Sequence, residues 1–403
     1  MDSHKNVASI IEFTRELVRV PSQGGIDSLD PIIDATTSWL SDSKLKSDTL
    51  VNSNGRPVGV LVRIESGRPG PIVCLDAPID TAPVGRTEAW SVPPFGGVVQ
   101  EGRMYGRGVA DAKVAVSLFC HLARELRRSK VVTAGAVHVL LDGDEHTGHF
   151  GGVRAYLQQI PSRPDFVAIG YPGNWGIKIG ARGFYRTKLC TFGEERHSGA
   201  RADTTPQNAI VKMAHLIRSL SETRLPVEPD PDFGFGPKLS ITSISGGAGY
   251  SQIPGQCVAN LDVRLTPGFS ASDAKRLIEG ALATVDEDRP TSRPSGHNED
   301  STWPPYRLEP NSSFVTALRT AAESAFKRRI ETAVVGPSNI GNYLASLGVP
   351  ATCGFGVSYD NQHAADEYIE VDTIAPVCDT YHRAVMAWCS SSDNAHARNA
   401  DLV

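Results

Sequence analysis

Residues 136–148 read Ala-Val-His-Val-Leu-Leu-Asp-Gly-Asp-Glu-His-Thr-Gly, and this stretch decides the fold class. The run 136–141 has the length and the apolar composition of a buried strand. An acidic turn that contains Glu145 and His146 follows it closely. Because functional side chains of α/β sheets collect at the carboxyl ends of strands, this turn is a candidate site.

The neighbouring segments repeat the alternation of strand and helix. Residues 58–64, 71–77 and 166–170 are further apolar runs of strand length. Residues 7–20 and 115–126 carry apolar side chains at helical spacing. This order predicts an α/β domain, a mixed sheet with helices on both faces.

The middle of the chain follows a different order. Residues 183–192, 238–244 and 256–265 are predicted strands, and residues 208–220 and 272–285 are predicted helices. This arrangement predicts a small α+β domain that is inserted into the larger one.

We place the domain boundaries at shifts in composition. The larger domain is expected to comprise residues 1–181 and 296–389, and the inserted domain residues 182–295. The polar tail, 390–403, is expected to be disordered.

The composition restricts the class of protein. The 403 residues are 40% hydrophobic and 21% charged, as in ordinary globular proteins. A formal net charge of −5 argues against nucleic acid as a partner. No run approaches the roughly 18 apolar residues of a membrane-spanning helix, so we expect no membrane partner. The 7 scattered cysteines form no CxxC pair, which indicates reduced thiols and predicts a cytoplasmic protein.

Further polar stretches stand beside predicted strands and helices. They are Asp76-Ala77-Pro78-Ile79-Asp80-Thr81-Ala82-Pro83, Gly106-Arg107-Gly108-Val109-Ala110-Asp111-Ala112-Lys113, Ile169-Gly170-Tyr171-Pro172 and Gln362-His363-Ala364-Ala365-Asp366-Glu367. Each alone is ordinary, since a single Asp before a helix is usually a cap.

Together, the order and spacing of these stretches resemble the acetylornithine deacetylase / succinyl-diaminopimelate desuccinylase family of zinc amidohydrolases and exopeptidases. Further matches are Trp90, Pro94-Phe95-Gly96-Gly97, Gly102, Gly151-Gly152, Arg182-Gly183, His197-Ser198, Ile253-Pro254 and Asp262-Val263-Arg264. The resemblance implies a zinc-peptidase-like α/β domain interrupted by a smaller lid or dimerisation domain. It also implies two zinc ions bridged by an Asp, a Glu that acts as general base, and a homodimer.

The resemblance assigns roles to residues of this chain by position. Asp111 matches the bridging ligand, His363 a ligand of the second zinc, and Glu145 the general base. Asp80 matches the Asp that orients a ligand of the first zinc. His197 matches the His that stabilises the oxyanion, from its own subunit or across the dimer.

The same comparison implies a substrate-binding set. Arg264 matches a residue that contacts a substrate carboxylate. Ser338 and Asn339 stand in a motif that lies near the substrate cleft in the family, and Tyr171 is also placed in this set.

Three positions depart from the family pattern. Pro78 replaces the His of the first zinc site, and Tyr171 replaces its carboxylate. His146 replaces the Glu of the second site. The first site therefore keeps Asp111 alone, whereas Asp111, His146 and His363 form a chemically sensible set for one ion. We expect one divalent metal (zinc, cobalt or manganese) or none, and no dinuclear centre.

The expected function is hydrolysis of the amide bond of an N-acyl amino acid or amino-acid-derived amide. One alternative is a metal-independent enzyme that performs amide formation, acyl transfer or cyclisation in a specialised biosynthetic pathway. Glu145 would then be the base and Tyr171 the proton donor. Another alternative is a catalytically inactive binding homologue. A small-molecule substrate is expected, and attachment of that substrate to a carrier protein stays open.

Overall fold

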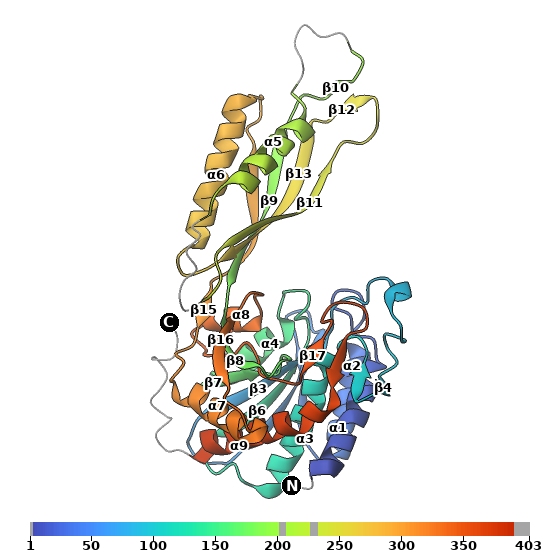
Figure 1. The fold of residues 1–403 in the computed structure, drawn as a ribbon, viewed down its shortest axis with the longest axis vertical. Coiled ribbons are helices and arrows are strands. Elements are labelled where there is room, and N and C mark those ends of the chain that lie inside the picture. Colours follow the sequence, from blue (N-terminus) through green and yellow to red (C-terminus); the bar gives the residue numbers. More distant parts are fainter. Residues whose placement is uncertain (1–2, 201–206, 226–232, 391–403) are drawn as a thin grey trace. The chain divides into compact units, whose positions relative to one another are not determined.

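The computed structural model describes residues 3–200, 207–225 and 233–390 (Figure 1). The chain divides into two compact units. Unit 1 comprises residues 1–179, 307–333 and 347–403, and unit 2 comprises residues 180–306 and 334–346. Apart from Ser390, which ends a helix, the predicted disordered tail lies outside the described residues.

Unit 1 is built on a five-stranded mixed sheet with the strand order β1-β2-β6-β3-β7. Its strands are β1 (Ser47–Val51), β2 (Pro57–Glu65), β6 (Ala136–Asp142), β3 (Ile72–Pro78) and β7 (Phe166–Ile169). β3 runs parallel to both β6 and β7, whereas β1, β2 and β6 pair antiparallel. All seven residues of β6 are buried, as expected for a central strand.

Helices surround this sheet. They are α1 (Ser3–Val18), α2 (Asp30–Asp42), α3 (Val114–Ser129), α4 (Gly151–Gln159), α7 (Ser313–Phe326) and α9 (Ile374–Ser390). α3 packs on β2, β3 and β6, and α4 packs on β1, β2 and β6. The apolar stripe of α3 is buried, and the charged residues Arg127 and Arg128 lie in the last turn of the helix. The predicted α/β class is confirmed.

A second sheet in unit 1 joins segments that are far apart in the sequence. Its strand order is β17-β18-β5-β4, with β17 (Tyr359–Asp360), β18 (Tyr368–Glu370), β5 (Arg103–Tyr105) and β4 (Val98–Gln100). η2 (Val109–Lys113) follows β5 and leads into α3. The pairing of β18 with β5 therefore places the loop 361–367 beside the start of η2.

Unit 2 is an antiparallel sheet with helices packed on it. The strand order is β11-β13-β9-β14, with β11 (Lys238–Gly246), β13 (Gln256–Leu265), β9 (Gly183–Phe192) and β14 (Gly296–Trp303). Helices α5 (Ala209–Glu222) and α6 (Ala271–Asp288) share an apolar core with β9 and β13. Ser270 begins α6 with a capping box that uses Asp273. β14, which the sequence boundaries assign to the larger domain, pairs with β9 in this sheet.

The remaining elements are short. β10 (Arg196–His197) pairs with β12 (Gln252–Ile253), and α8 (Ile340–Ser346) belongs to unit 2. β15 (Tyr306–Arg307), β8 (Gly176–Ala181) and β16 (Glu331–Val335) form a sheet in which the chain passes from one unit to the other. Short turns form η1 (Thr87–Ala89) and η3 (Val371–Thr373). Among the helices in the described ranges, none has the length and apolar character needed to cross a bilayer.

Candidate metal centre

Three side chains from distant parts of unit 1 converge at one point. Asp111 lies in η2, His146 follows β6, and His363 lies between β17 and β18. One ligand atom from each residue lies within 4.8 Å of the other two. Asp111 Oδ2 is 3.0 Å from His363 Nε2 and 3.6 Å from His146 Nε2. The structure thus gathers the three residues that the sequence proposes as metal ligands.

Several buried polar atoms of this group have no hydrogen-bond partner among the described residues. They are Asp111 Oδ1 and both ring nitrogens of His146. An unsatisfied buried polar atom costs about 1–3 kcal/mol, and a bound cation removes that cost. One carboxylate and two imidazoles are ligands that zinc, cobalt and manganese accept. These residues fit one divalent ion.

The charges of the group favour an ionised Asp111. Burial alone would raise the pKa of this carboxyl, but the neighbouring imidazoles of His146 and His363 hold the pKa below its ordinary value. Burial alone would lower the pKa of His146, but Glu145, Asp111 and Asp80 raise it well above the ordinary value. The carboxylate is therefore available as a ligand at neutral pH, and a metal would displace a proton from His146.

Glu145 lies between the metal-binding group and a tyrosine. Its Oε1 accepts a hydrogen bond of 2.6 Å from the hydroxyl of Tyr171, and its Oε2 is 3.1 Å from His146 Nδ1. Burial raises the pKa of Glu145 to about 7. A carboxyl group whose pKa is near neutrality can both accept and return a proton, which is what a general base in amide chemistry must do.

Asp80 holds the turn that carries Glu145 and His146. Its side chain is fully buried. Oδ1 accepts the amide N–H of Glu145 at 3.1 Å, and Oδ2 accepts the amide N–H of His146 at 2.9 Å. Oδ2 also lies 3.6 Å from His146 Nδ1. Asp80 therefore holds both the backbone of this turn and the ring of His146 in place.

The first-site positions offer no comparable ligands. Pro78 is the last residue of β3 and has no donor atom for a metal. Tyr171 follows β7, and its buried side chain directs its hydroxyl at Glu145. Within the described ranges, Asp111, His146 and His363 form the one group of three or more potential ligands.

Among the substrate-binding candidates of unit 2, Arg264 and Ser338 contact each other, whereas Asn339 and the predicted oxyanion residue His197 bond to other groups. Arg264 donates from Nη1 to Ser338 Oγ at 3.1 Å, and Ser338 Oγ donates to the carbonyl of Arg182 at 2.7 Å. Asn339 instead accepts the amide N–H of Gly341, at 2.8 Å. His197 is exposed on β10, and its Nδ1 accepts the amide N–H of Gly199 at 3.1 Å.

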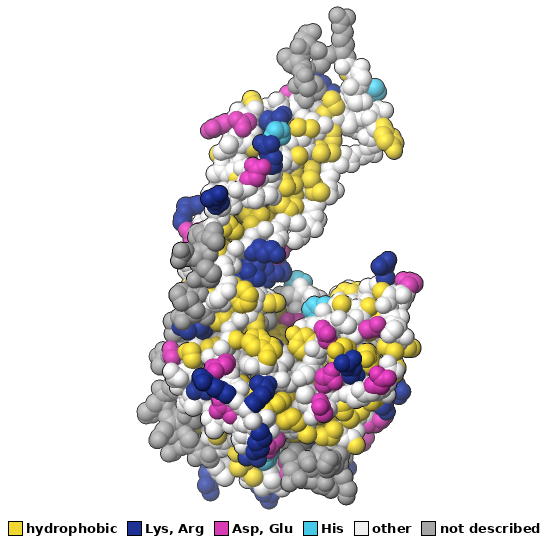
Figure 2. Space-filling model, in the orientation of Figure 1, with side chains coloured by type: hydrophobic (Ala, Val, Ile, Leu, Met, Phe, Trp, Pro, Cys, Tyr) yellow, Lys and Arg dark blue, Asp and Glu magenta, His cyan; other side chains and the backbone are white. Residues whose placement is uncertain are grey.

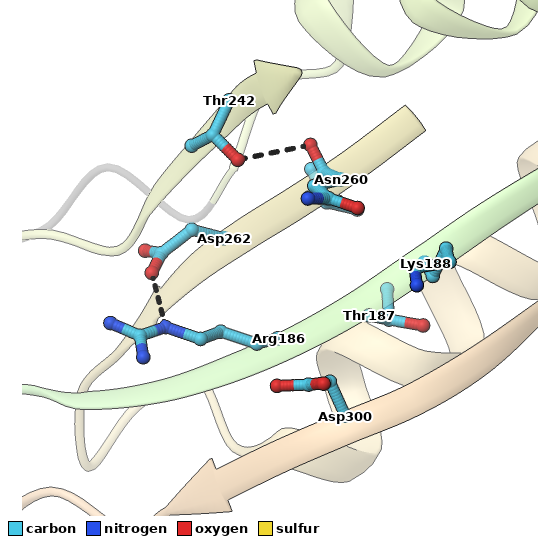
Figure 3. A pocket seen from close by; sticks show the side chains of 8 residues that line it. Arg186, Thr187, Lys188, Thr242, Asn260, Asp262 and Asp300 are labelled. Carbon is cyan, nitrogen blue, oxygen red and sulfur yellow. Dashed lines mark hydrogen bonds and ion pairs between the residues drawn. The ribbon is translucent and has the colours of Figure 1, made fainter. Parts of the chain in front are cut away.

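A carboxylate partly neutralises the arginines of unit 2. Asp262 pairs with Arg264 at 2.8 Å and with Arg186 at 3.0 Å. Figure 3 shows the pair with Arg186 at the edge of a pocket of about 330 Å³ on this sheet, which Lys188 and Asp300 also line. The salt bridge to Nε leaves Arg264 with its two terminal nitrogens for Ser338 and for an anionic group of a ligand.

Comparison with known proteins identifies the family. Residues 74–387 match the model of peptidase family M20/M25/M40. The chain belongs to this family. The resemblance drawn from the motifs is therefore confirmed over most of the chain.

Individual M20 relatives are distant but cover nearly the full length. The succinyl-diaminopimelate desuccinylase of Parvibaculum lavamentivorans is 25% identical, with 94% of this chain and 95% of the relative covered. The acetylornithine deacetylase of Vibrio campbellii is also 25% identical, with 91% and 96% covered. The M20 family metallo-carboxypeptidase Sso-CP2 of Sulfolobus solfataricus superimposes with a TM-score of 0.75 at 17% identity, covering 96% and 100%. This last likeness shows that the fold is shared.

Three residues that contact the segments carrying Asp111 and His363 were not predicted to act there. Gln362 donates from Nε2 to Asp111 Oδ2 at 2.5 Å. Arg107 and Glu367 form a buried ion pair of 2.5 Å. All three lie inside motifs that the sequence singles out, but a side-chain pair separated by 260 residues leaves no signal in a single sequence.

Proposed function

We propose that this M20 enzyme hydrolyses the amide bond of an N-acyl amino acid or an amino-acid-derived amide. The observation that carries the proposal is the convergence of Asp111, His146 and His363 beside the half-buried carboxylate of Glu145. The names of the relatives, a desuccinylase and a deacetylase, support this substrate class.

In this mechanism the protein supplies the base and its orientation. Asp111, His146 and His363 would hold the metal, which would supply Lewis acidity to the reaction. Glu145 takes a proton from the attacking water and passes it to the leaving amine nitrogen. Because the hydroxyl of Tyr171 donates a hydrogen bond to Oε1 of Glu145, we assign the proton transfer to Oε2, which lies on the side of His146.

We infer that at most one ion takes part. Proline at position 78 and a tyrosine engaged with Glu145 at position 171 support this inference. A site with Asp111 as its single protein ligand lacks the three ligands of an ordinary catalytic zinc site.

The residues of unit 2 keep the roles that the family resemblance implies. Arg264, with Ser338 and Asn339, would bind the carboxylate of the substrate, and His197 would stabilise the oxyanion. The terminal nitrogens of Arg264 support this role. On this reading unit 1 is the catalytic domain and unit 2 the lid or dimerisation domain, of a cytoplasmic enzyme.

We propose a homodimer formed through unit 2. β11 is an edge strand of its sheet, and most of its residues are exposed. Exposed apolar side chains lie on this strand, on α5 and in the loop after β11, namely Ile244 at 53%, Val211 at 42% and Tyr250. Unpaired strand edges and clustered exposed apolar groups are typical of association surfaces. Light scattering that shows a monomer at micromolar concentration would refute the dimer.

One observation favours a second candidate. The short hydrogen bond between Tyr171 and Glu145 forms an acid–base pair that needs no metal. Such a pair suits the metal-independent alternative, in which Glu145 activates an amine and Tyr171 donates a proton during amide formation, acyl transfer or cyclisation.

Elemental analysis of protein purified without chelator, combined with a hydrolysis assay on N-acetyl and N-succinyl amino acids, tests these candidates. About one equivalent of metal and hydrolysis that Glu145→Gln abolishes would support the hydrolase. Absence of metal after zinc, cobalt and manganese supplements would refute that mechanism and favour the metal-independent route. Thermal stabilisation by these amides without turnover would instead indicate an inactive binding homologue.

A further inference from the structure

A fully buried glutamate organises the backbone around Asp111. Glu367 is 0% exposed, and each of its two carboxylate oxygens accepts two hydrogen bonds. Oε2 accepts from Arg107 Nη1 at 2.5 Å and from the amide N–H of Gly108 at 3.1 Å. Oε1 accepts the amide N–H groups of Ala110 at 3.0 Å and of Asp111 at 3.3 Å. Three of the four donors are therefore backbone groups of the segment that carries Asp111.

Arg107 ties the same pair to the loop of His363. Its side chain is 1% exposed, and its Nη2 donates to the carbonyl of Ala364, the residue after His363, at 3.0 Å. The amide N–H of Gly106 donates to the carbonyl of Glu367 at 3.0 Å, which adds a backbone link. The pair thus joins two segments that are far apart in the sequence and that each carry one potential metal ligand.

The far end of the Asp111 segment is also anchored. Lys113 is fully buried and donates from Nζ to the carbonyl of Leu17 at 2.9 Å and to that of Val20 at 2.7 Å. Asp111 therefore sits between two side-chain anchors, Glu367 on one side and Lys113 on the other. Of the two anchors, Glu367 is the one that belongs to the loop of His363.

Metal binding is sensitive to small changes in the positions of the ligand atoms on these two segments. Ligand distances in working sites hold to within about 0.2 Å. Asp111 Oδ2 and His363 Nε2 are 3.0 Å apart, and their separation depends on how the two backbone segments are held. Removing one partner of a buried ion pair leaves an uncompensated buried charge, which is costly. We therefore expect the Asp111 segment and the His363 loop to shift when the pair between Arg107 and Glu367 is broken.

We propose that Glu367, together with Arg107, is the positioning residue of the metal centre: its carboxylate fixes the Asp111 segment against the His363 loop. Glu367 touches neither substrate nor metal in this role and acts through the backbone of Asp111. The inference rests on the proposed metal centre, and its test is chosen so that the two can fail separately.

The test measures cobalt affinity and folding stability in the same set of variants. Glu367→Gln preserves the shape of the side chain but removes its charge. Asp286→Asn in unit 2 is the matched control, because Asp286 pairs at 2.6 Å with Lys212, a lysine that is also 0% exposed. Both substitutions should lower the urea midpoint of unfolding. Only Glu367→Gln should weaken Co²⁺ binding, by roughly 10- to 100-fold, and change the cobalt absorption spectrum.

Each outcome decides the inference. Equal Co²⁺ affinity in Glu367→Gln and the unmodified chain would overturn it, as would an equal loss in Asp286→Asn. If Glu367→Gln does not fold, Arg107→Lys, which keeps the charge but loses the two-nitrogen geometry, takes its place with the same expectation.

If the unmodified chain binds no Co²⁺, the proposed metal centre is wrong. In that case the position of the His363 loop relative to Asp111 is measured by NMR of the His363 imidazole. Its ¹⁵N signals, assigned with His363→Ala, report the contact with Asp111. A change of these signals in Glu367→Gln supports positioning, and unchanged signals overturn it.

Discussion

The two sides of Glu145 offer very different environments to an ion. On one side, Oε2 lies 3.1 Å from His146, which belongs to the group with Asp111 and His363. On the other side, Oε1 accepts a hydrogen bond of 2.6 Å from Tyr171. The first side holds a carboxylate and two imidazoles, whereas the second holds a hydroxyl group.

Two further carboxyl groups, those of Asp76 and Asp142, are buried, and burial together with the charge of Glu145 raises the pKa of both. Asp76 and Asp142 lie on β3 and β6, and Pro78 pairs in register with Asp142. Both are fully buried, and none of their four carboxylate oxygens has a hydrogen-bond partner in the described part of the chain. Burial raises the pKa of Asp76 to about 7, whereas the pKa of Asp111 is held below its ordinary value by two imidazoles.

The contrast shows that the sheet forms with proline at position 78 and tyrosine at position 171, where the family resemblance implies metal ligands. Pro78 ends β3, and the amide N–H of the next residue, Ile79, donates to the carbonyl of Asp142, so the contact between β3 and β6 continues past the proline. Tyr171 fills its position with a buried ring and gives its hydroxyl a partner in Glu145. The sheet persists because its strand pairing does not depend on metal ligands.

The largest expected effect concerns His146. His146→Ala removes one of two imidazoles, so metal content should fall from about one equivalent to none. His149→Ala is the matched control, because His149 is exposed in the same turn. Elemental analysis after dialysis measures both variants. Retention of a full equivalent in His146→Ala would show that the metal-binding side is wrongly assigned.

A gain of metal is expected when the other side is rebuilt. The double variant Pro78→His with Tyr171→Asp returns an imidazole and a carboxylate to the first site. Metal content should rise from about one to about two equivalents, and either single change should leave it at one. If the unmodified chain already binds two ions, the two sides do not differ as proposed.

A smaller effect is expected from Tyr171→Phe. The variant loses the hydrogen bond to Glu145 but keeps the ring, so metal content should be unchanged. Hydrogen bonds to charged groups contribute about 1.5–3 kcal/mol, so kcat/KM for hydrolysis should fall roughly 10- to 100-fold. Tyr359→Phe, a half-buried tyrosine of unit 1, serves as the control. A rate equal to that of the unmodified chain would exclude a role for this hydrogen bond.

The smallest effect is one of stability. Because burial raises the pKa of Asp76 from about 4 in the unfolded chain to about 7, the folded state binds its proton more tightly. This group therefore stabilises the fold below about pH 4, and its contribution is lost as the pH rises to about 7. Asp76→Asn cannot ionise and should be more stable than the unmodified chain at pH 7, by about 1–3 kcal/mol, but not at pH 4.5.

Urea unfolding at the two pH values measures this difference. Asp48→Asn is the control, since Asp48 forms an exposed pair with Arg63 and should show little change at either pH. The quantity compared is the difference in unfolding free energy between Asp76→Asn and the unmodified chain. If this difference is the same at pH 7 and at pH 4.5, the prediction is wrong.

The sequence was sufficient for the family and the α/β class, and it nominated three candidate metal ligands. The apolar run 136–141 and the turn after it predict a strand with functional groups at its end, and β6 ends at Asp142, just before that turn. Periodicity and residue type are local properties, so they can be read without coordinates. Asp111, His146 and His363 could be proposed as ligands because their side chains carry the right atoms.

The tertiary structure alone decided how these groups meet. The sequence could not show that Tyr171 donates to Glu145, that Asp80 accepts the amides of Glu145 and His146, or that Glu367 supports Asp111. Each of these contacts joins segments brought together by strand pairing and loop packing. A hydrogen bond depends on tenths of an ångström and on angles. A single sequence records which atoms are present, and only the packed chain fixes where they lie.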